Sequence, residues 1–261
     1  MKHAVTAHAD IVGSLLRPRE LLEARESHAA GELSAAEFKR VEDRAVDWVI
    51  GLQERAGLPV VTDGEMRRES FQSQMVEATD GFGGHDIDAW LWGEWHGEGE
   101  VGDKTTERPR TLGVVGKLRR RRHLSVEEFV YARGRTDKII KVTLPSPSLY
   151  ANLWSPELSV EAYPTLDLFL EDVAEILRGE VEELARLGAE YIQLDAPHYP
   201  LLLDPKTRAF YEQRGWDLDR WLSRGIELDN YVIGAHKDVT FSFHLCRGNQ
   251  GSRWRAASSA A

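Results

Sequence analysis

The stretch LDLFLEDVAEILRGEVEELARLGAEYIQLD, residues 166–195, decides the fold class. Apolar residues recur at helical spacing from Leu166 to Leu187, and Gly188 then ends the pattern, so we predict an amphipathic helix. The helix leads directly into the apolar run Tyr191 to Leu194, a predicted strand that ends at Asp195. A helix followed by a short strand is the repeating unit of parallel α/β folds.

The same alternation of strand-like and helix-like segments continues on both sides of this stretch. The other predicted strands are Ala4 to Val12, Val60 to Asp63, Ser73 to Ala78, Lys138 to Leu144 and Val239 to Leu245. The other predicted helices are Ser34 to Ala56, which has capping-box spacing at its start, and Thr207 to Leu228. About six βα units result, which predicts an α/β fold of the TIM (β/α)8 barrel type, whereas a closed barrel has eight.

The domain organisation follows from this count. A chain of 261 residues suits a single barrel domain over residues 1–261. Because the last strands are missing from the count, we expect an incomplete barrel in a truncated or frameshifted chain. Residues 81–116 are rich in glycine and charge and carry Trp90, Trp92 and Trp95, which predicts a long loop over the mouth of the site. A β-hairpin or an oligomer contact is the alternative for these tryptophans.

Charge and composition limit the binding partners and the cellular compartment that we expect for the protein. The net charge is -10 and the pI about 5.4, so the average surface repels nucleic-acid phosphates and anionic lipid. We therefore expect neither nucleic acid nor membrane partners, and we interpret the basic run at 117–123 as a solvated face. The single cysteine, Cys246, fits a reducing cytoplasm. The sequence leaves a homo-oligomer open.

The most informative pair of residues lies in His244-Leu245-Cys246. Residues two apart on a strand project to the same face, so the imidazole and the thiolate can converge on one ion. Zinc accepts this ligand set, whereas ordinary core packing is the alternative for such a pair. The pair ends a predicted barrel strand, where the active-site residues of this architecture gather.

Two carboxylates and a serine occupy comparable positions. Glu65 follows the predicted strand Val60 to Asp63, Asp195 ends the strand at 191–194, and Ser14 follows the first strand after Gly13. Carboxylates at strand ends can bind an ammonium group, act as acid or base, or ligate a metal. Helix capping is the alternative role for them.

Taken in this order, the four sites resemble the C-terminal catalytic barrel of cobalamin-independent methionine synthase, from about Ile11 to Asn249. The segments that match its motifs are Val12-Gly13-Ser14, Gly64-Glu65, Gln193-Leu194-Asp195 and His244-Leu245-Cys246. The first is similar to the family's Gly-Ser turn, the second to its Gly-Glu element, the third to its Gln-x-Asp strand end and the last to its His-x-Cys zinc pair. The run 141–147, KVTLPSP, is similar to the family's strand and loop before the middle of the barrel.

The resemblance implies a zinc-dependent enzyme that transfers a methyl or alkyl group to a thiol, as in methionine biosynthesis. His244 and Cys246 would be two zinc ligands. Ser14, Glu65 and Asp195 would bind the amino-acid part of a thiol such as homocysteine. The methyl donor in this family is a methylated folate with a glutamate tail, as in 5-methyltetrahydropteroyltriglutamate-homocysteine S-methyltransferase.

The sequence departs from the family pattern at three points. Ala196 replaces an acidic residue, the second barrel of the full-length synthases has no counterpart, and no cysteine follows Cys246 to complete the zinc site. We therefore expect weak or absent zinc binding by this chain. A metal-free enzyme on a barrel like that of uroporphyrinogen decarboxylase and a non-catalytic truncated fragment are the two alternatives.

Overall fold

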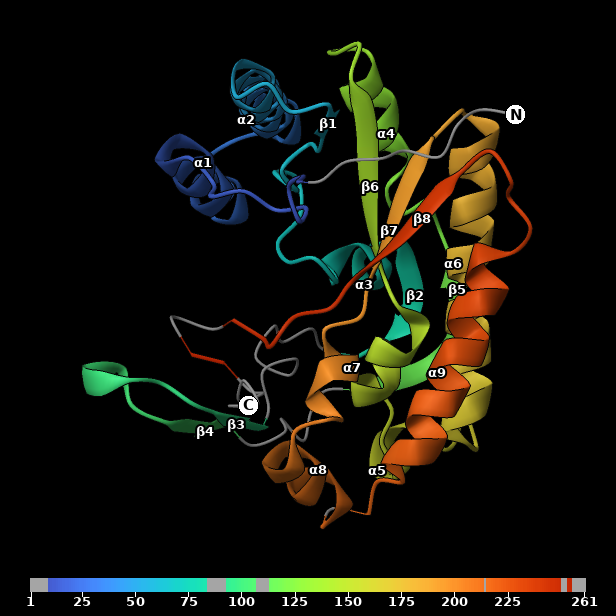
Figure 1. The fold of residues 1–261 in the computed structure, drawn as a ribbon. Coiled ribbons are helices and arrows are strands. Elements are labelled where there is room, and N and C mark those ends of the chain that lie inside the picture. Colours follow the sequence, from blue (N-terminus) through green and yellow to red (C-terminus); the bar gives the residue numbers. More distant parts are fainter. Residues whose placement is uncertain (1–8, 84–92, 107–112, 214, 250–252, 255–261) are drawn as a thin grey trace.

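The computed structural model describes residues 9–83, 93–106, 113–213, 215–249 and 253–254. Its centre is a parallel sheet of four strands in the order β1 (Val60–Val61), β6 (Ile139–Pro145), β7 (Tyr191–Asp195) and β8 (Thr240–His244) (Figure 1). Pro145 pairs with Asp195, and Asp195 pairs with His244, so three strands end at the same level. Within the described residues the sheet does not close into a ring, and β1 and β8 form its two edges.

Helices connect the strands, as the predicted α/β fold of the barrel type requires. The longer ones are α1 (Arg19–Ala29), α2 (Ala35–Arg55), α4 (Val126–Arg133), α6 (Leu166–Arg186) and α9 (Leu218–Ile233). α6 and α9 run side by side along one flank of the sheet, and α1 packs on α2 near β1 (Figure 1). The shorter helices are α3 (Ser73–Ala78), η2 (Gly99–Val101), η3 (Pro147–Leu153), α5 (Pro156–Ser159), α7 (His198–Leu201) and α8 (Pro205–Glu212). No helix in the described ranges is long and apolar enough to cross a membrane.

Helices α2 and α6 form where the sequence predicts them. The capping box of α2 is present: the Glu37 N–H donates to Ser34 Oγ, and the Ser34 N–H donates to Glu37 Oε2 at 3.1 Å. The apolar stripe of α6 is buried at Phe169, Val173 and Leu177, each of which is fully buried. The stripe therefore covers the sheet, as amphipathic helices of α/β folds do.

Three expected elements differ from the structure. Residues 73–78 form helix α3 rather than a strand, and β2 (Thr79–Phe82) begins where that helix ends. Short apolar runs do not separate helix from strand, and Met75 and Ala78 are good helix formers. The region 207–228 belongs to two helices and not to one. α8 ends at Glu212, and α9 begins at Leu218 with Asp217 as its N-cap.

The third difference concerns the predicted strand Ala4 to Val12. Residues 4–8 lie outside the described part of the chain, and residues 9–12 carry no strand. The carbonyl oxygens of Ile11 and Val12 accept hydrogen bonds from the side chains of Lys141 and Gln193. Side chains thus provide the hydrogen bonds of these two carbonyls, in place of the main-chain bonds that a neighbouring strand would make.

The segment 81–116 contains strands of its own. β3 (Gly93–Trp95) pairs antiparallel with β4 (Lys104–Thr106), and Trp95 is buried. β5 (Val114–Arg120) pairs with β2, and Arg119 on it lies 2.7 Å from Asp80 in a surface ion pair. Trp90 and Trp92, which share the predicted loop with Trp95, lie outside the described residues.

Candidate functional site

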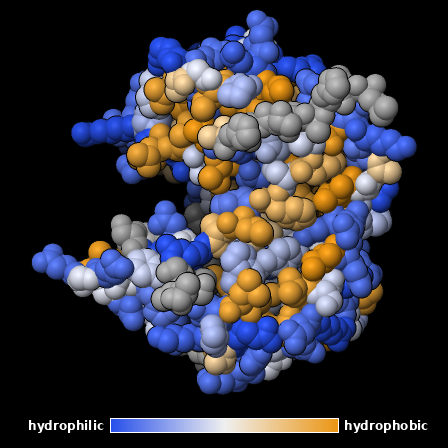
Figure 2. All heavy atoms as spheres, in the orientation of Figure 1, coloured by the Kyte–Doolittle hydropathy of each residue, from blue (hydrophilic) through white to orange (hydrophobic). Residues whose placement is uncertain are grey.

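All five site residues predicted from the sequence line one cavity at the carboxyl ends of the strands. The cavity has a volume of about 490 Å³, and Ser14, Glu65, Asp195, His244 and Cys246 contribute to its wall. Figure 2 shows a hollow in the surface on the side toward which these strands run, between the α1–α2 region and the β3–β4 hairpin. Active sites of barrel enzymes lie at this end of the strands.

Glycine brings Ser14 next to Glu65. Ser14 forms a parallel bridge with Gly64, and the Leu15 N–H donates to the Gly64 carbonyl at 3.0 Å. A Cβ atom at Gly13 would lie 2.7 Å from Glu65 Oε1, closer than real Cβ contacts allow. The Gly-Ser turn therefore lets the first segment approach the carboxylate directly.

Glu65 has the one positive φ of any non-glycine residue in the described ranges, at 56°. Such backbone costs free energy and persists where the surrounding structure holds it, as it often does at functional sites. The Glu65 side chain is buried, and Thr143 Oγ1 donates to its Oε1 at 2.8 Å. Burial raises the pKa of Glu65, while the Arg68 guanidinium and the Thr143 hydroxyl act in the opposite direction.

Behind Glu65 lies a buried ion-pair network that the sequence did not reveal. Arg68 Nη2 lies 2.8 Å from Glu128 Oε2, and Nη1 donates to Thr143 Oγ1 at 3.0 Å and lies 3.7 Å from Glu65 Oε1. Burial raises the pKa of Glu128 to about 7, although Arg68 opposes the shift. Glu128 is 60 residues from Arg68 in the chain, and no local spacing connects them.

Asp195 and His244 are hydrogen-bonded neighbours on β7 and β8. His244 Nδ1 lies 3.1 Å from Asp195 Oδ1, and the contacts with Asp195 and Cys246 raise the pKa of His244 to about 10. Burial disfavours the Cys246 thiolate, but hydrogen bonds from His244 and from the Gly248 N–H lower the pKa of Cys246 below its usual value. The pair therefore favours an imidazolium beside a thiolate.

The donor types of His244 and Cys246 suit zinc, which binds imidazole nitrogen and thiolate sulfur. Among the residues that the structure describes, no group of three or more His, Cys, Asp or Glu side chains is arranged to hold a metal ion. The two side chains fit zinc as a pair of ligands and do not complete its coordination. Ala196, in place of the family's acidic residue, is fully buried and adds no donor.

Aromatic and apolar residues also line the cavity. Its wall includes Phe71, Trp95, Leu149 and Trp221. His198 also lines it, with its ring stacked on Trp221 at a centroid distance of 5.5 Å and an angle of 25°. This wall comes from segments that the sequence did not assign to the site, apart from Trp95.

His198 is a buried neutral histidine. Its Nε2 lies 2.7 Å from Ser148 Oγ, whereas its Nδ1 is buried with no hydrogen-bond partner among the described residues. Burial lowers the pKa of His198 from 6.5 to about 3. The position three residues after Asp195 is the only sequence signal that could have pointed to it.

This burial predicts a loss of stability in acid. Below pH 6.5 the His198 side chain takes up a proton in the unfolded chain but not in the folded one. The free energy of unfolding therefore falls as the pH drops from 6.5 toward 3. Between pH 7 and pH 5, urea unfolding of the native protein should lose about 2 kcal/mol more than that of His198→Gln. Asp229, whose burial raises its pKa to about 6, titrates in both proteins, so the difference isolates His198. Equal losses in the two proteins would contradict the prediction.

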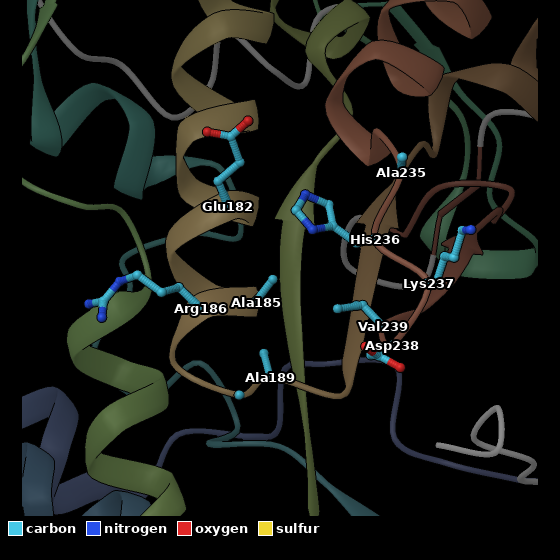
Figure 3. Close-up of a pocket in the computed structure, with 10 residues that line it drawn as sticks. Glu182, Ala185, Arg186, Ala189, Ala235, His236, Lys237, Asp238 and Val239 are labelled. Carbon is cyan, nitrogen blue, oxygen red and sulfur yellow. The ribbon is translucent and has the colours of Figure 1, made fainter. Parts of the chain in front are cut away.

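A second cavity, of about 580 Å³, lies at the opposite ends of β7 and β8. Figure 3 shows Glu182 and Arg186 on α6 and His236 and Lys237 on the segment before β8, with Arg186 and Lys237 extending away on opposite sides. None of the five predicted residues lines this cavity. Because the amino ends of barrel strands serve stability rather than chemistry, the cavity at the carboxyl ends is the candidate site.

Known proteins share this chain's sequence pattern. YxjH of Bacillus subtilis, an uncharacterised protein, is 28% identical over 251 residues, which cover 95% of this chain and 64% of YxjH. A methionine synthase of Sulfurisphaera tokodaii is 31% identical over 188 residues, which cover 72% of this chain and 51% of that protein. The chain thus spans less than two thirds of the length of these relatives.

The fold is also found among solved structures. A Listeria monocytogenes protein described as a vitamin-B12-independent methionine synthase superposes with a TM-score of 0.69 at 24% identity, over 96% of this chain and 68% of that one. The family model of the catalytic domain of cobalamin-independent synthase matches residues 6–254. The chain therefore belongs to the cobalamin-independent synthase family.

Proposed function

We propose that the cavity binds a thiol amino acid such as homocysteine and carries the site for methyl or alkyl transfer to its sulfur. The observation that carries this proposal is the convergence of two carboxylates, Glu65 and Asp195, with the His244 and Cys246 pair in one cavity. A site of this composition has hydrogen-bond acceptors for an ammonium group and side-chain ligands for a metal ion that binds the substrate sulfur. Membership of the family and the name of the S. tokodaii relative support the reaction type.

The two carboxylates would hold the amino group of the substrate. Asp195 accepts hydrogen bonds from Gln193 and His244 on the same oxygen, Oδ1, which leaves Oδ2 for a ligand. Glu65 Oε1 accepts a hydrogen bond from Thr143. Because Glu65 is buried, its attraction for an ammonium group is stronger than that of the same pair in water. Ser14, at the exposed rim, would donate to the carboxylate of the amino acid.

Zinc held in part by His244 and Cys246 belongs to the proposal, and when bound it would stabilise the thiolate form of the substrate. The protein's own contribution is to fix the amino acid so that its sulfur meets the methyl group in line. A bond then forms between sulfur and the methyl carbon as the bond between that carbon and the donor breaks.

The aromatic residues of the cavity wall suit the flat ring of a methyl donor such as a folate. Phe71, Trp95 and Trp221 are among the residues that line the cavity. Since Trp95 lines the cavity, the segment 81–116 would contribute to the mouth of the site, as a loop carrying the β3–β4 hairpin. The family match favours the synthases over a metal-free decarboxylase-like enzyme. The open sheet is the observation that favours the other alternative, a non-catalytic fragment, and the titration below tests it.

Calorimetric titration of the purified protein with L-homocysteine, with and without Zn²⁺, tests the proposal. We expect weak zinc binding, because two side chains provide only half of a tetrahedral site, and at least tenfold tighter zinc binding when L-homocysteine supplies a further sulfur ligand. In Cys246→Ser this gain should be lost.

L-methionine, which has no thiol, is the control ligand for that titration. We expect it to bind the native protein and Cys246→Ser equally, through Glu65 and Asp195. Absence of binding of both amino acids by the native protein would overturn the proposed function. Stoichiometric zinc binding by Cys246→Ser would contradict the assignment of the His244 and Cys246 pair as the zinc ligands.

A further inference from the structure

A buried lysine, the first residue of the run 141–147, lies beneath the site and has been given no role in it so far. Lys141 is on β6 and only 2% exposed. Its Nζ lies 3.1 Å from Asp10 Oδ2 and 2.9 Å from Gln193 Oε1, and it donates to the Ile11 carbonyl. An ammonium group has three N–H donors, and these three acceptors satisfy all of them.

The contact with Lys141 fixes the orientation of the Gln193 amide. A lysine ammonium can only donate, so the oxygen of the amide must face it. The amide nitrogen then faces the other way, where it donates to the Val12 carbonyl at 2.7 Å and to Asp195 Oδ1 at 2.8 Å. Both of those groups can only accept, which is consistent with this orientation and excludes the flipped one.

The line of hydrogen bonds continues into the site. Asp195 Oδ1 accepts from Gln193 and lies 3.1 Å from His244 Nδ1. Donation by Nδ1 orients the His244 ring with its Nε2 away from Asp195. The order Lys141, Gln193, Asp195, His244 therefore runs from a buried cation on β6 through β7 to β8.

We propose that Lys141 and Gln193 are positioning residues that set the orientation of the Asp195 carboxylate toward the bound amino acid. The inference rests on the proposed function, since Asp195 is taken to hold the amino group of the substrate. Lys141 also ties residues 10–11 to β6.

A purely structural role for Lys141 makes a different prediction. If Lys141 only anchored residues 10–11, its loss would weaken ligand binding by the same factor whether or not Asp195 carries a charge. If it acts through Asp195, its effect should largely vanish once that charge is removed. A double-mutant cycle separates the two cases, because groups that act through one another are not additive.

The experiment measures the dissociation constant of L-homocysteine for Lys141→Met and Gln193→Met, each alone and combined with Asp195→Asn. We expect each single change to weaken binding at least tenfold, and less than twofold in the Asp195→Asn background. Lys138→Met, at an exposed lysine three residues earlier, is the matched control and should bind like the native protein. Gln193→Met keeps the contacts of Lys141 with Asp10 and Ile11, so it tests the inference even if Lys141→Met does not fold.

Equal factors in the two backgrounds, or unchanged binding by both single variants, would overturn the positioning role and leave the proposed function intact. Failure of the native protein to bind L-homocysteine would overturn both. The two failures are therefore distinguishable in one series of titrations.

Discussion

Asp195→Asn is expected to weaken the binding of L-homocysteine about 100-fold, which corresponds to about 2.7 kcal/mol. The change removes the negative charge that we propose to hold the amino group of the ligand, and the loss of one partner of a buried charge pair typically costs 2 kcal/mol or more. The fold should be unaffected. The amide oxygen of asparagine can still accept the two hydrogen bonds that Gln193 and His244 make to Oδ1.

Titration calorimetry checks this prediction, and circular dichroism checks the fold. The matched control is Asp238→Asn, which removes a charge from the second cavity at the amino ends of the strands. It should leave the dissociation constant unchanged. Equal affinity in Asp195→Asn and the native protein, or a comparable loss in Asp238→Asn, would place the amino group of the ligand elsewhere.

Arg68→Met is expected to lower the free energy of unfolding by about 3 to 5 kcal/mol, the range observed when one partner of a buried ion pair is removed. Arg68 is 2% exposed, and it donates to Glu128 through Nε at 3.0 Å and Nη2 at 2.8 Å. Without it, Glu128 and Glu65 would face each other's charge in a buried region. Their ionised forms are already disfavoured there by burial.

Urea unfolding of Arg68→Met and of the double variant Arg68→Met with Glu128→Gln measures this effect. The second change removes the orphaned charge while keeping a group that can bond Gln74, so the double variant should regain more than half of the loss. Arg119→Met, in an ion pair with Asp80 on the surface, should cost little. Additive losses in the double variant would show that the charge of Glu128 is not the cause.

The parts of the fold that the sequence predicted are those with a strong periodic pattern. Helices α2 and α6 have long apolar stripes with caps or glycine ends, and strands β6, β7 and β8 are apolar runs beside them. Residues 73–78 were assigned wrongly because six residues are too few to separate the two periods. Residues 9–12 read as a strand from their apolar character, but side chains of β6 and β7 take their hydrogen bonds.

The gathering of the five candidate residues in one cavity could be predicted, because four of them follow or end a strand and parallel strands bring their carboxyl ends together. Ser14 follows a segment that forms no strand and reaches the cavity through its bridge to Gly64.

The groups that support these residues could not be predicted. Arg68 meets Glu128 across 60 residues, and His198 is held by Ser148 across 50, so only the packed fold creates these contacts. The strained backbone at Glu65 is likewise invisible in the sequence.

A crystal structure of the protein with L-homocysteine tests the central claim most directly. We predict the amino group within hydrogen-bond distance of Asp195 and Glu65, and the sulfur on the side of His244 and Cys246. A ligand bound in the cavity between α6 and β8, or one whose sulfur lies away from His244 and Cys246, would contradict the assignment of the site.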